Sequence, residues 1–249
     1  MESLPEQTYI KNMTNAKRPM SNAAKSTFVP GELSLLDLRV IQCQLGRPPH
    51  QVLGAVTRCR YGLPEVILTN PIIEGKSPFP TFLWLSCPLL KKKIDRLEGA
   101  GWVRRLQAIV DGTKDEGGGG KRNELPRRGL GIEESVSTPL SSSQKNEVEI
   151  LETLKQEIRE GASEVSLGTQ LIEDNQSYIC LRNRYIDSTI REKFGSLEKK
   201  GIAGSENLSR IKCLHAHYAH FLATGENIIG RIIHRLLDAR KGYTCSTAL

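Results

Sequence analysis

Long apolar runs are missing from this sequence, and their absence excludes two classes of protein. No segment approaches the roughly 20 apolar residues that a membrane-spanning helix needs. Residues 1–27 also contain no apolar stretch of the length found in secretory signal peptides. We therefore expect a cytoplasmic protein without a membrane span.

Cysteines are few and widely spaced. The six cysteines stand at positions 43, 59, 87, 180, 213 and 245, and no two of them form a CxxC pair. This spacing does not fit a dense disulfide framework, nor the local spacing of known zinc modules. We expect reduced thiols, with disulfide pairing as the alternative.

Common catalytic and nucleotide-binding motifs are also missing. The sequence has no Rossmann glycine pattern after a strand, no Walker loop, no GxSxG elbow and no HExxH helix. Its formal charge is +7, which makes phosphate groups, nucleic acid and other anions plausible partners. The basic residues are scattered, however, and no nucleic-acid-binding motif accompanies them.

Apolar runs and turn formers predict an α+β fold with a three-stranded antiparallel meander. The three strand-like runs cover 51–59, 65–69 and 81–87, and the segments between them are too short for parallel crossovers. A short, largely buried helix with Leu35, Leu36, Leu38, Val40 and Ile41 is predicted before the meander, ending at Gly46. Further helices are predicted over 88–110 with a break at 99–101, and over 145–161, 175–195, 205–225 and 226–237.

Composition divides the chain into four parts. Residues 1–30 are predicted to form a flexible basic tail, and residues 31–110 to hold a helix, the meander and a helix. Residues 111–144 are rich in glycine, serine and charge, so we expect a flexible linker or insertion there. Residues 145–240 are predicted to form a helical part that packs on the meander.

One segment, "CLHAHYAH", concentrates groups that bind metals or move protons. On a helix, Cys213, His217 and His220 fall at i, i+4 and i+7 and share one face, whereas His215 points away. Cys213, His215 and His220 are therefore candidates for catalysis through a thiol with a histidine partner. The alternative is a core helix in which the cysteine acts as a small apolar residue.

The predicted meander adds two cysteines to this group. Cys59 and Cys87 end the first and third strands, which run in the same direction, so both are expected at one edge of the sheet. Together with Cys213 and His217 they form a candidate zinc site, because sulfur and nitrogen ligands suit zinc. Glu98, by contrast, is expected to pair with Arg96 on a helix surface rather than to act as an acid catalyst.

A second candidate site would bind an anion. The segment "GIAGSENLSR" brings a glycine turn to a predicted helix N-terminus, where free N–H groups favour phosphate. The candidate residues are Arg58, Arg182, Arg184, Arg191, Gly201 and Gly204. The alternative is that the glycines only make the turn and the arginines lie on solvated faces.

Several stretches together resemble a bacterial family, the domain-of-unknown-function family number 501. They are "QLGRPP" (44–49), "RCRYGLPEV" (58–66), "SPFPTFLWLSCPLL" (77–90), "RLEGAGW" (96–102) and "KCLHAHYAH" (212–220). The resemblance covers about residues 33–110 and 175–235. The family's genes often lie near those for a septum-formation initiator protein and an exopolyphosphatase-type phosphatase, which implies a phosphate or cell-division context but no activity.

The sequence thus predicts a non-enzymatic protein that binds a small anionic or phosphorylated ligand, or a protein partner. The pocket is expected between the edge of the meander and the helix over 205–225, lined by Cys59, Cys87, Cys213 and His215 or His220. The alternative is a small metal- or Cys/His-dependent hydrolase. A basic nucleic-acid-binding protein is the second alternative, suggested by charge alone.

Overall fold

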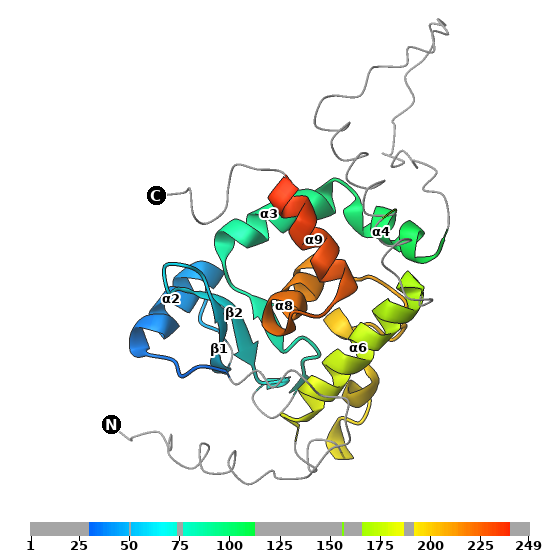
Figure 1. The fold of residues 1–249 in the computed structure, drawn as a ribbon. Coiled ribbons are helices and arrows are strands. Elements are labelled where there is room, and N and C mark those ends of the chain that lie inside the picture. The colour runs from blue at the N-terminus through cyan, green and yellow to red at the C-terminus, as the bar shows by residue number, and fades with distance from the viewer. Residues whose placement is uncertain are drawn as a thin grey trace, which may run out of the picture.

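A small antiparallel sheet packs against a group of helices in the computed structural model of the chain (Figure 1). The structure describes residues 30–49, 51–73, 77–112, 156, 166–186 and 192–239. The sheet has the order β1-β2-β5, and both strand pairs are antiparallel. Its strands are β1 (Val52–Arg58), β2 (Pro64–Thr69) and β5 (Leu83–Leu85). The predicted meander and the α+β class are confirmed.

A two-stranded ribbon of β3 (Ile72–Ile73) and β4 (Ser77–Pro78) occupies the connection between β2 and β5. The sequence did not predict this ribbon, because its strands are only two residues long. The ribbon leads the chain back to β5, which lies at the edge of the three-stranded sheet.

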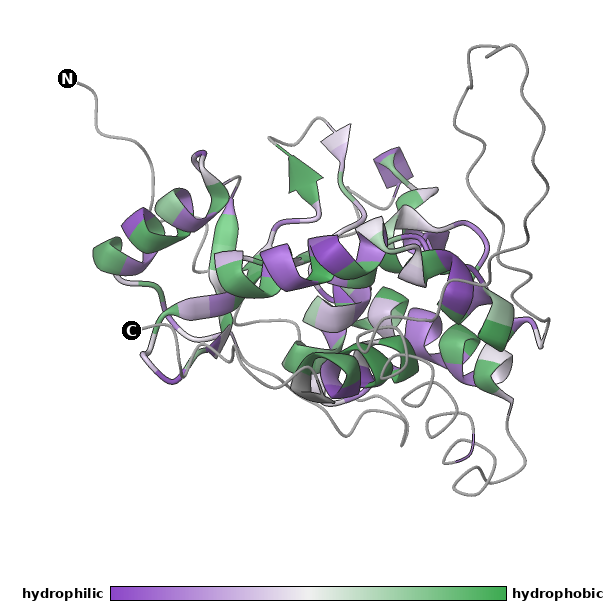
Figure 2. Cartoon of the chain, turned by 90° about the horizontal axis from the view of Figure 1, so that it is seen from above, coloured by the Kyte–Doolittle hydropathy of each residue, from purple (hydrophilic) through white to green (hydrophobic). Residues whose placement is uncertain are grey.

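Helix α2 (Leu35–Leu45) lies outside the sheet, and most of its apolar residues face solvent. Ser34 caps its N-terminus in a capping box with Asp37, and Gly46 ends it in the left-handed conformation. The predicted burial of this helix is wrong: Leu35 is 81% and Leu36 is 69% exposed. The helix packs on β2 and is joined to the end of β1 by the Asp37–Arg58 ion pair, so a narrow side of it, centred on Ile41, is covered. Figure 2 shows α2 with its apolar residues at the border of the molecule.

Two helices follow the sheet, α3 (Pro88–Gly99) and α4 (Trp102–Val110). Pro88 begins α3, a position where proline's missing N–H costs nothing. Gly101 separates the helices with a φ of 81°, a conformation that favours glycine. The predicted break at 99–101 is therefore confirmed.

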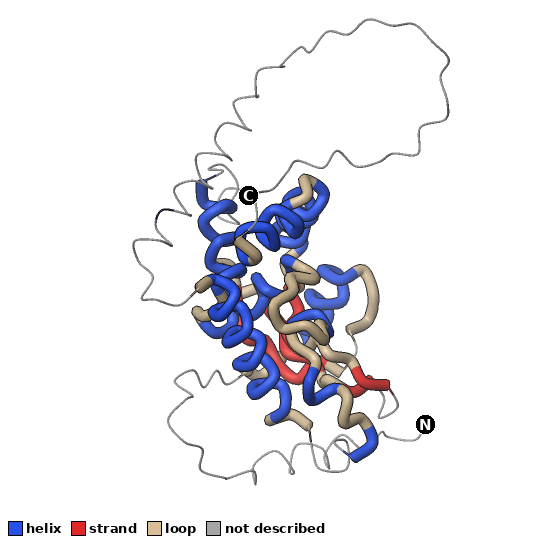
Figure 3. The backbone as a smooth tube through the Cα atoms, turned by 90° about the vertical axis from the view of Figure 1, so that its right-hand side faces the viewer, coloured by secondary structure: helices blue, strands red, loops and turns tan. Residues whose placement is uncertain are grey.

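The C-terminal part contributes three helices and two 3₁₀ turns. The helices are α6 (Leu167–Asn183), α8 (Leu214–Thr224) and α9 (Ile228–Ala239), and the turns are η1 (Leu197–Lys199) and η2 (Ile202–Gly204). Figure 1 shows α8 in the middle of the molecule, with the sheet and α2 on one side and α6 on the other. Figure 3 shows the strands bordered by helices.

The predicted helix over 205–225 starts only at Leu214. Gln107 of α4 explains part of this late helix start, because its side-chain amide binds the backbone of the segment just before Leu214. Its Oε1 accepts a hydrogen bond from the Ile211 N–H at 2.8 Å, and its Nε2 donates to the Ser209 carbonyl at 3.0 Å. These bonds hold residues 209–211 in a non-helical path and leave Cys213 extended just before the helix.

One continuous core joins the sheet to the helices. It includes Val66 and Leu68 of β2, Trp102 of α4, and Leu214 and Ala219 of α8, all fully buried. Helix α9 packs closely on α8, since a Cβ on Gly230 would lie 2.7 Å from the His217 carbonyl oxygen. The core therefore fixes both ends of α8 relative to the sheet.

Some predictions fall on residues outside the described ranges. These are the basic tail up to residue 29, the linker from residue 113 on, and the helix over 145–161, of which only Gln156 is described. Arg191 and Cys245 also lie outside the described ranges. In the described ranges, no helix combines the length and the apolar character that crossing a membrane requires. The five cysteines there are free thiols.

Candidate functional site

Helix α3 meets the beginning of α8 through Glu98. The carboxylate oxygen Oε1 of Glu98 accepts a hydrogen bond of 2.7 Å from the Leu214 N–H, the first residue of α8. A carboxylate at this position is favoured by the free N–H groups and the dipole of the helix. The contact brings Glu98 next to Cys213 and His215, which flank Leu214.

Glu98, Cys213 and His215 form a compact group of metal-ligand types. One ligand atom of each lies within 4.8 Å of the others, and all three residues are partly buried. The His215 Nδ1 lies 3.3 Å from Glu98 Oε1 and 3.9 Å from Cys213 Sγ. Among the described residues, no other group of three or more His, Cys, Asp or Glu comes this close.

The imidazole of His215 is fixed from its other side as well. Its Nε2 lies 3.2 Å from Asp95 Oδ1 and 3.3 Å from the Lys91 carbonyl oxygen. Lys91, Asp95 and Glu98 follow one another at i, i+4 and i+7, so one face of α3 supplies the oxygen acceptors around the ring.

Electrostatics favour a charged His215 in the metal-free protein. Burial lowers its pKa, but hydrogen bonds to Cys213 and Glu98 outweigh burial and raise the pKa to about 10. The hydrogen bond from His215 also lowers the pKa of Glu98, against the effect of burial. The resting group is therefore an imidazolium between two carboxylates.

Two members of this group, Cys213 and His215, lie on the wall of a groove of about 400 Å³. Cys213, His215 and Asp95 line the groove together with Trp84 of β5 and Phe79. Arg47, just after α2, completes it with a positive charge. The volume falls within the usual range for small-molecule sites.

The structure does not assemble the metal site that the sequence predicted. Cys59 and Cys87 belong to no ligand group with Cys213 in the described residues. Cys87 is 4% exposed and immediately precedes α3, while Cys59 follows β1. The ligand-type side chains next to Cys213 are instead Glu98 of α3 and His215 of α8.

His217 and His220 both lie within α8 and contact Asn227. Cys213 stands just before the helix in an extended conformation, and it joins neither histidine in a ligand group of the described residues. Both histidines are fully buried, and the Nδ1 of each lies within 3.3 Å of the Asn227 side-chain amide. Burial lowers the pKa of His217 to about 4 and that of His220 to about 3, so both are neutral at physiological pH.

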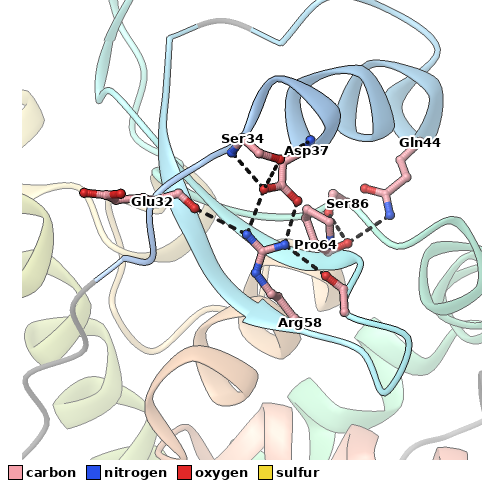
Figure 4. Close-up of polar contacts among 8 residues, drawn as sticks. Glu32, Ser34, Asp37, Gln44, Arg58, Pro64 and Ser86 are labelled. Atoms are coloured by element: carbon pink, nitrogen blue, oxygen red, sulfur yellow. Dashed lines mark hydrogen bonds and ion pairs between the residues drawn. The ribbon is translucent and has the colours of Figure 1, made fainter.

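The predicted anion site is likewise dispersed. Figure 4 shows Arg58 held by internal acceptors: its guanidinium binds both carboxylate oxygens of Asp37, at 2.6 and 3.0 Å, and the Gly62 carbonyl. Arg182 is fully buried and donates to the carbonyls of Pro80, Leu197 and Lys200.

The glycine turn has a structural role too. Gly201 and Gly204 bound the short turn η2, which ends ten residues before α8, so no helix N-terminus follows them directly. A Cβ on Gly201 would lie 2.3 Å from Asn175 Oδ1, which explains the need for glycine there. Arg184 is exposed where α6 ends, and Arg191 lies outside the described residues.

Sequence reasoning missed Glu98 as a site residue. It was expected in a surface pair with Arg96, yet its side chain is 30% exposed and faces α8. A signal was available: Glu98 stands four residues after Ile94 and next to Leu97, both fully buried, so it borders the apolar stripe of α3.

Comparison with known families agrees with the resemblance in the sequence. The family model described as "Protein of unknown function (DUF501)" matches residues 55–117 and 143–235, more than half of the chain. These ranges include Glu98, Cys213 and His215. No curated protein and no solved structure matches the chain. The chain therefore belongs to this family of proteins of unknown function.

Proposed function

We propose that this protein binds a zinc ion through Glu98, Cys213 and His215, and holds a small anionic ligand in the adjoining groove. The observation that carries the proposal is the close approach of the Glu98 oxygen, the Cys213 sulfur and the His215 nitrogen, because Cys213 and His215 also line the groove. This ligand set suits zinc, and three protein ligands leave a fourth tetrahedral position for water or ligand.

The distances between the ligand atoms support this assignment. Tetrahedral zinc with ordinary bond lengths places nitrogen and oxygen ligands roughly 3.3 Å apart, and sulfur and nitrogen ligands roughly 3.6 Å apart. The His215 Nδ1 is 3.3 Å from Glu98 Oε1 and 3.9 Å from Cys213 Sγ. Small side-chain movements are enough to admit the ion.

The orientation of His215 is a second support. A metal-binding histidine usually donates its other N–H to a carboxylate or a backbone carbonyl, which fixes the ring. Asp95 and the Lys91 carbonyl occupy these positions at Nε2, while Nδ1 faces Glu98 and Cys213. The ion would replace the Nδ1 proton, so its affinity rises with pH.

Zinc analysis of the purified protein tests this proposal. The full chain is prepared without a His tag or chelator, equilibrated with one equivalent of zinc, and dialysed before elemental analysis. We expect about one zinc per chain, lost in Cys213→Ser and His215→Gln, and retained in Cys180→Ser, which changes an exposed cysteine of α6. Zinc-free but folded wild-type protein would make the group a salt-bridged link between α3 and α8, and would overturn the proposal.

A cysteine-dependent hydrolase is the second candidate, and the position of Cys213 favours it. The thiol lies at the start of α8 with its Sγ 3.9 Å from the His215 Nδ1, and a cysteine beside a histidine is the arrangement that nucleophilic catalysis uses. Zinc-free protein distinguishes the candidates: a hydrolase predicts that iodoacetamide modifies Cys213 faster than Cys180, and that His215→Gln removes the difference. Free thiols at both positions fit the reducing cytoplasm, where we propose that the protein acts.

A further inference from the structure

We infer that the ligand of this groove is a planar aromatic molecule with one anionic group, bound by Trp84 and Arg47. The inference deepens the proposed function, on which it rests, because it names the class of ligand for the same groove. It depends on groove residues other than the metal-ligand group, so the two can be tested separately.

Trp84 supplies a fixed aromatic surface. It stands between Leu83 and Leu85, which face the core, so its own side chain points to the other side of the edge strand β5. Its Nε1 donates a hydrogen bond of 2.9 Å to the Thr81 carbonyl, which holds the ring in place. The Phe79 ring lies 5.3 Å away at 40°, and the two rings form an apolar surface suited to another ring.

Arg47 supplies the positive charge. Its guanidinium carbon lies 5.5 Å from the centre of the Trp84 ring. Within the described residues no carboxylate pairs with this guanidinium, in contrast to Arg58, which is bound by Asp37. Gly46 ends α2 immediately before Arg47, and two prolines follow it, so its backbone is well fixed.

These two groups set the chemistry of the ligand. A guanidinium binds phosphate or carboxylate through two parallel N–H donors, and a tryptophan face attracts aromatic rings. The Arg47 guanidinium lies over the Trp84 ring and both residues line the groove, so a ligand that contacts both must carry its anionic group next to its ring. Arg47, Phe79 and Trp84 also line a smaller adjoining cavity of about 100 Å³, so this aromatic surface separates two hollows.

Intrinsic fluorescence offers a direct measurement. The chain has two tryptophans, and Trp102 is fully buried in the core, so a ligand in the groove changes chiefly the emission of Trp84. Phenyl phosphate is the probe, inorganic phosphate presents the anion alone, and benzyl alcohol presents the ring alone. Benzoate distinguishes a carboxylate ligand from a phosphate ligand. We expect saturable quenching by phenyl phosphate or benzoate, with at least tenfold tighter binding than either partial probe.

Variants connect the signal to the two residues. Arg47→Gln is expected to weaken binding at least tenfold, and Trp84→Leu to abolish it when calorimetry replaces fluorescence. Arg39→Gln removes the same charge from the exposed side of α2 and should leave binding unchanged. Equal affinities for phenyl phosphate and inorganic phosphate, or equal effects of Arg47→Gln and Arg39→Gln, would overturn the inference.

Zinc-free and zinc-loaded protein are both titrated, so that the two proposals fail in distinguishable ways. If the protein holds zinc but phenyl phosphate and benzoate do not bind, the inference about the ligand is wrong and the zinc site stands. If either probe binds through Arg47 and Trp84 while zinc does not bind at all, the ligand class stands and the metal proposal is wrong.

Discussion

A single carboxylate, Glu98, links two functions at the residue scale. It caps α8 through the Leu214 N–H and holds the imidazole of His215. The cap requires only an acceptor oxygen, whereas the interaction with His215 requires negative charge. A substitution that preserves the oxygen and removes the charge therefore separates the two roles.

Glu98→Gln is expected to leave the fold intact and to disturb the candidate metal site. The pKa of His215 should fall towards its ordinary value, because one of the groups that raise it is lost. Zinc affinity should fall at least tenfold, since an amide is a much poorer zinc ligand than a carboxylate. Histidine NMR titration and zinc competition measure the two effects. An unchanged zinc affinity would remove Glu98 from the site.

The buried histidines make a separate prediction about pH. His217 and His220 have pKa values of about 4 and 3 in the folded chain, below the ordinary value of 6.5. The stability that depends on their neutral forms is present above pH 6.5 and is lost progressively as the pH falls towards these values. The loss is on the order of 3 kcal/mol for His217 and about 5 kcal/mol for His220 between the unfolded and folded pKa values.

Urea unfolding of wild-type protein and His220→Gln across this pH range isolates the effect. A comparison is needed because Asp174 acts in the opposite direction: burial raises its pKa to about 6. The glutamine does not titrate, and its amide can still pair with Asn227, so the variant should lose less stability on acidification. Identical pH profiles for both proteins would contradict the assigned neutral state of His220.

At the element scale, α2 shows why an apolar pattern does not by itself establish burial. Its leucines resemble those of a core helix, yet Leu35 and Leu36 are exposed and only Ile41 is fully buried. The leucine pattern predicts an apolar helix, but the helix is buried only where other parts of the fold pack against it. Here the sheet covers one side, and the ion pair between Asp37 and Arg58 fixes the helix there.

Two substitutions in α2 measure the difference in stability between its buried and its exposed apolar residues. Ile41→Ala should lower the free energy of unfolding by about 3 kcal/mol, because it leaves a cavity between α2 and β2. Leu35→Ala, an equally large truncation on the same helix, should change it by less than about 0.5 kcal/mol. Urea denaturation of both variants provides the measurement. Comparable losses would mean that another surface covers Leu35 in solution.

At the scale of the whole molecule, the sequence predicted those features that depend on neighbouring residues. The meander follows from turns too short for crossovers, and the helix break follows from Gly99 and Gly101. The candidate site was predicted only in part, because its partners are distant along the chain. His215 was singled out, but Glu98 lies more than a hundred residues before it.

The arginines illustrate the same limit. Nothing local to Arg58 shows that Asp37 occupies its guanidinium, and nothing local to Arg182 shows that three carbonyls do so. Arg47 lies over an aromatic ring and lines the groove. Long-range packing therefore decides which arginines are bound within the fold and which arginine lines the groove.

Zinc titration by calorimetry, with wild-type protein, Cys213→Ser and Cys59→Ser, tests the central claim most directly. The metal site built from α3 and α8 predicts about one tightly bound zinc in the wild type and in Cys59→Ser, and none in Cys213→Ser. Zinc binding to the wild type should release a proton, because zinc displaces a proton from His215. Loss of zinc in Cys59→Ser, or no zinc binding by folded wild-type protein, would contradict the account.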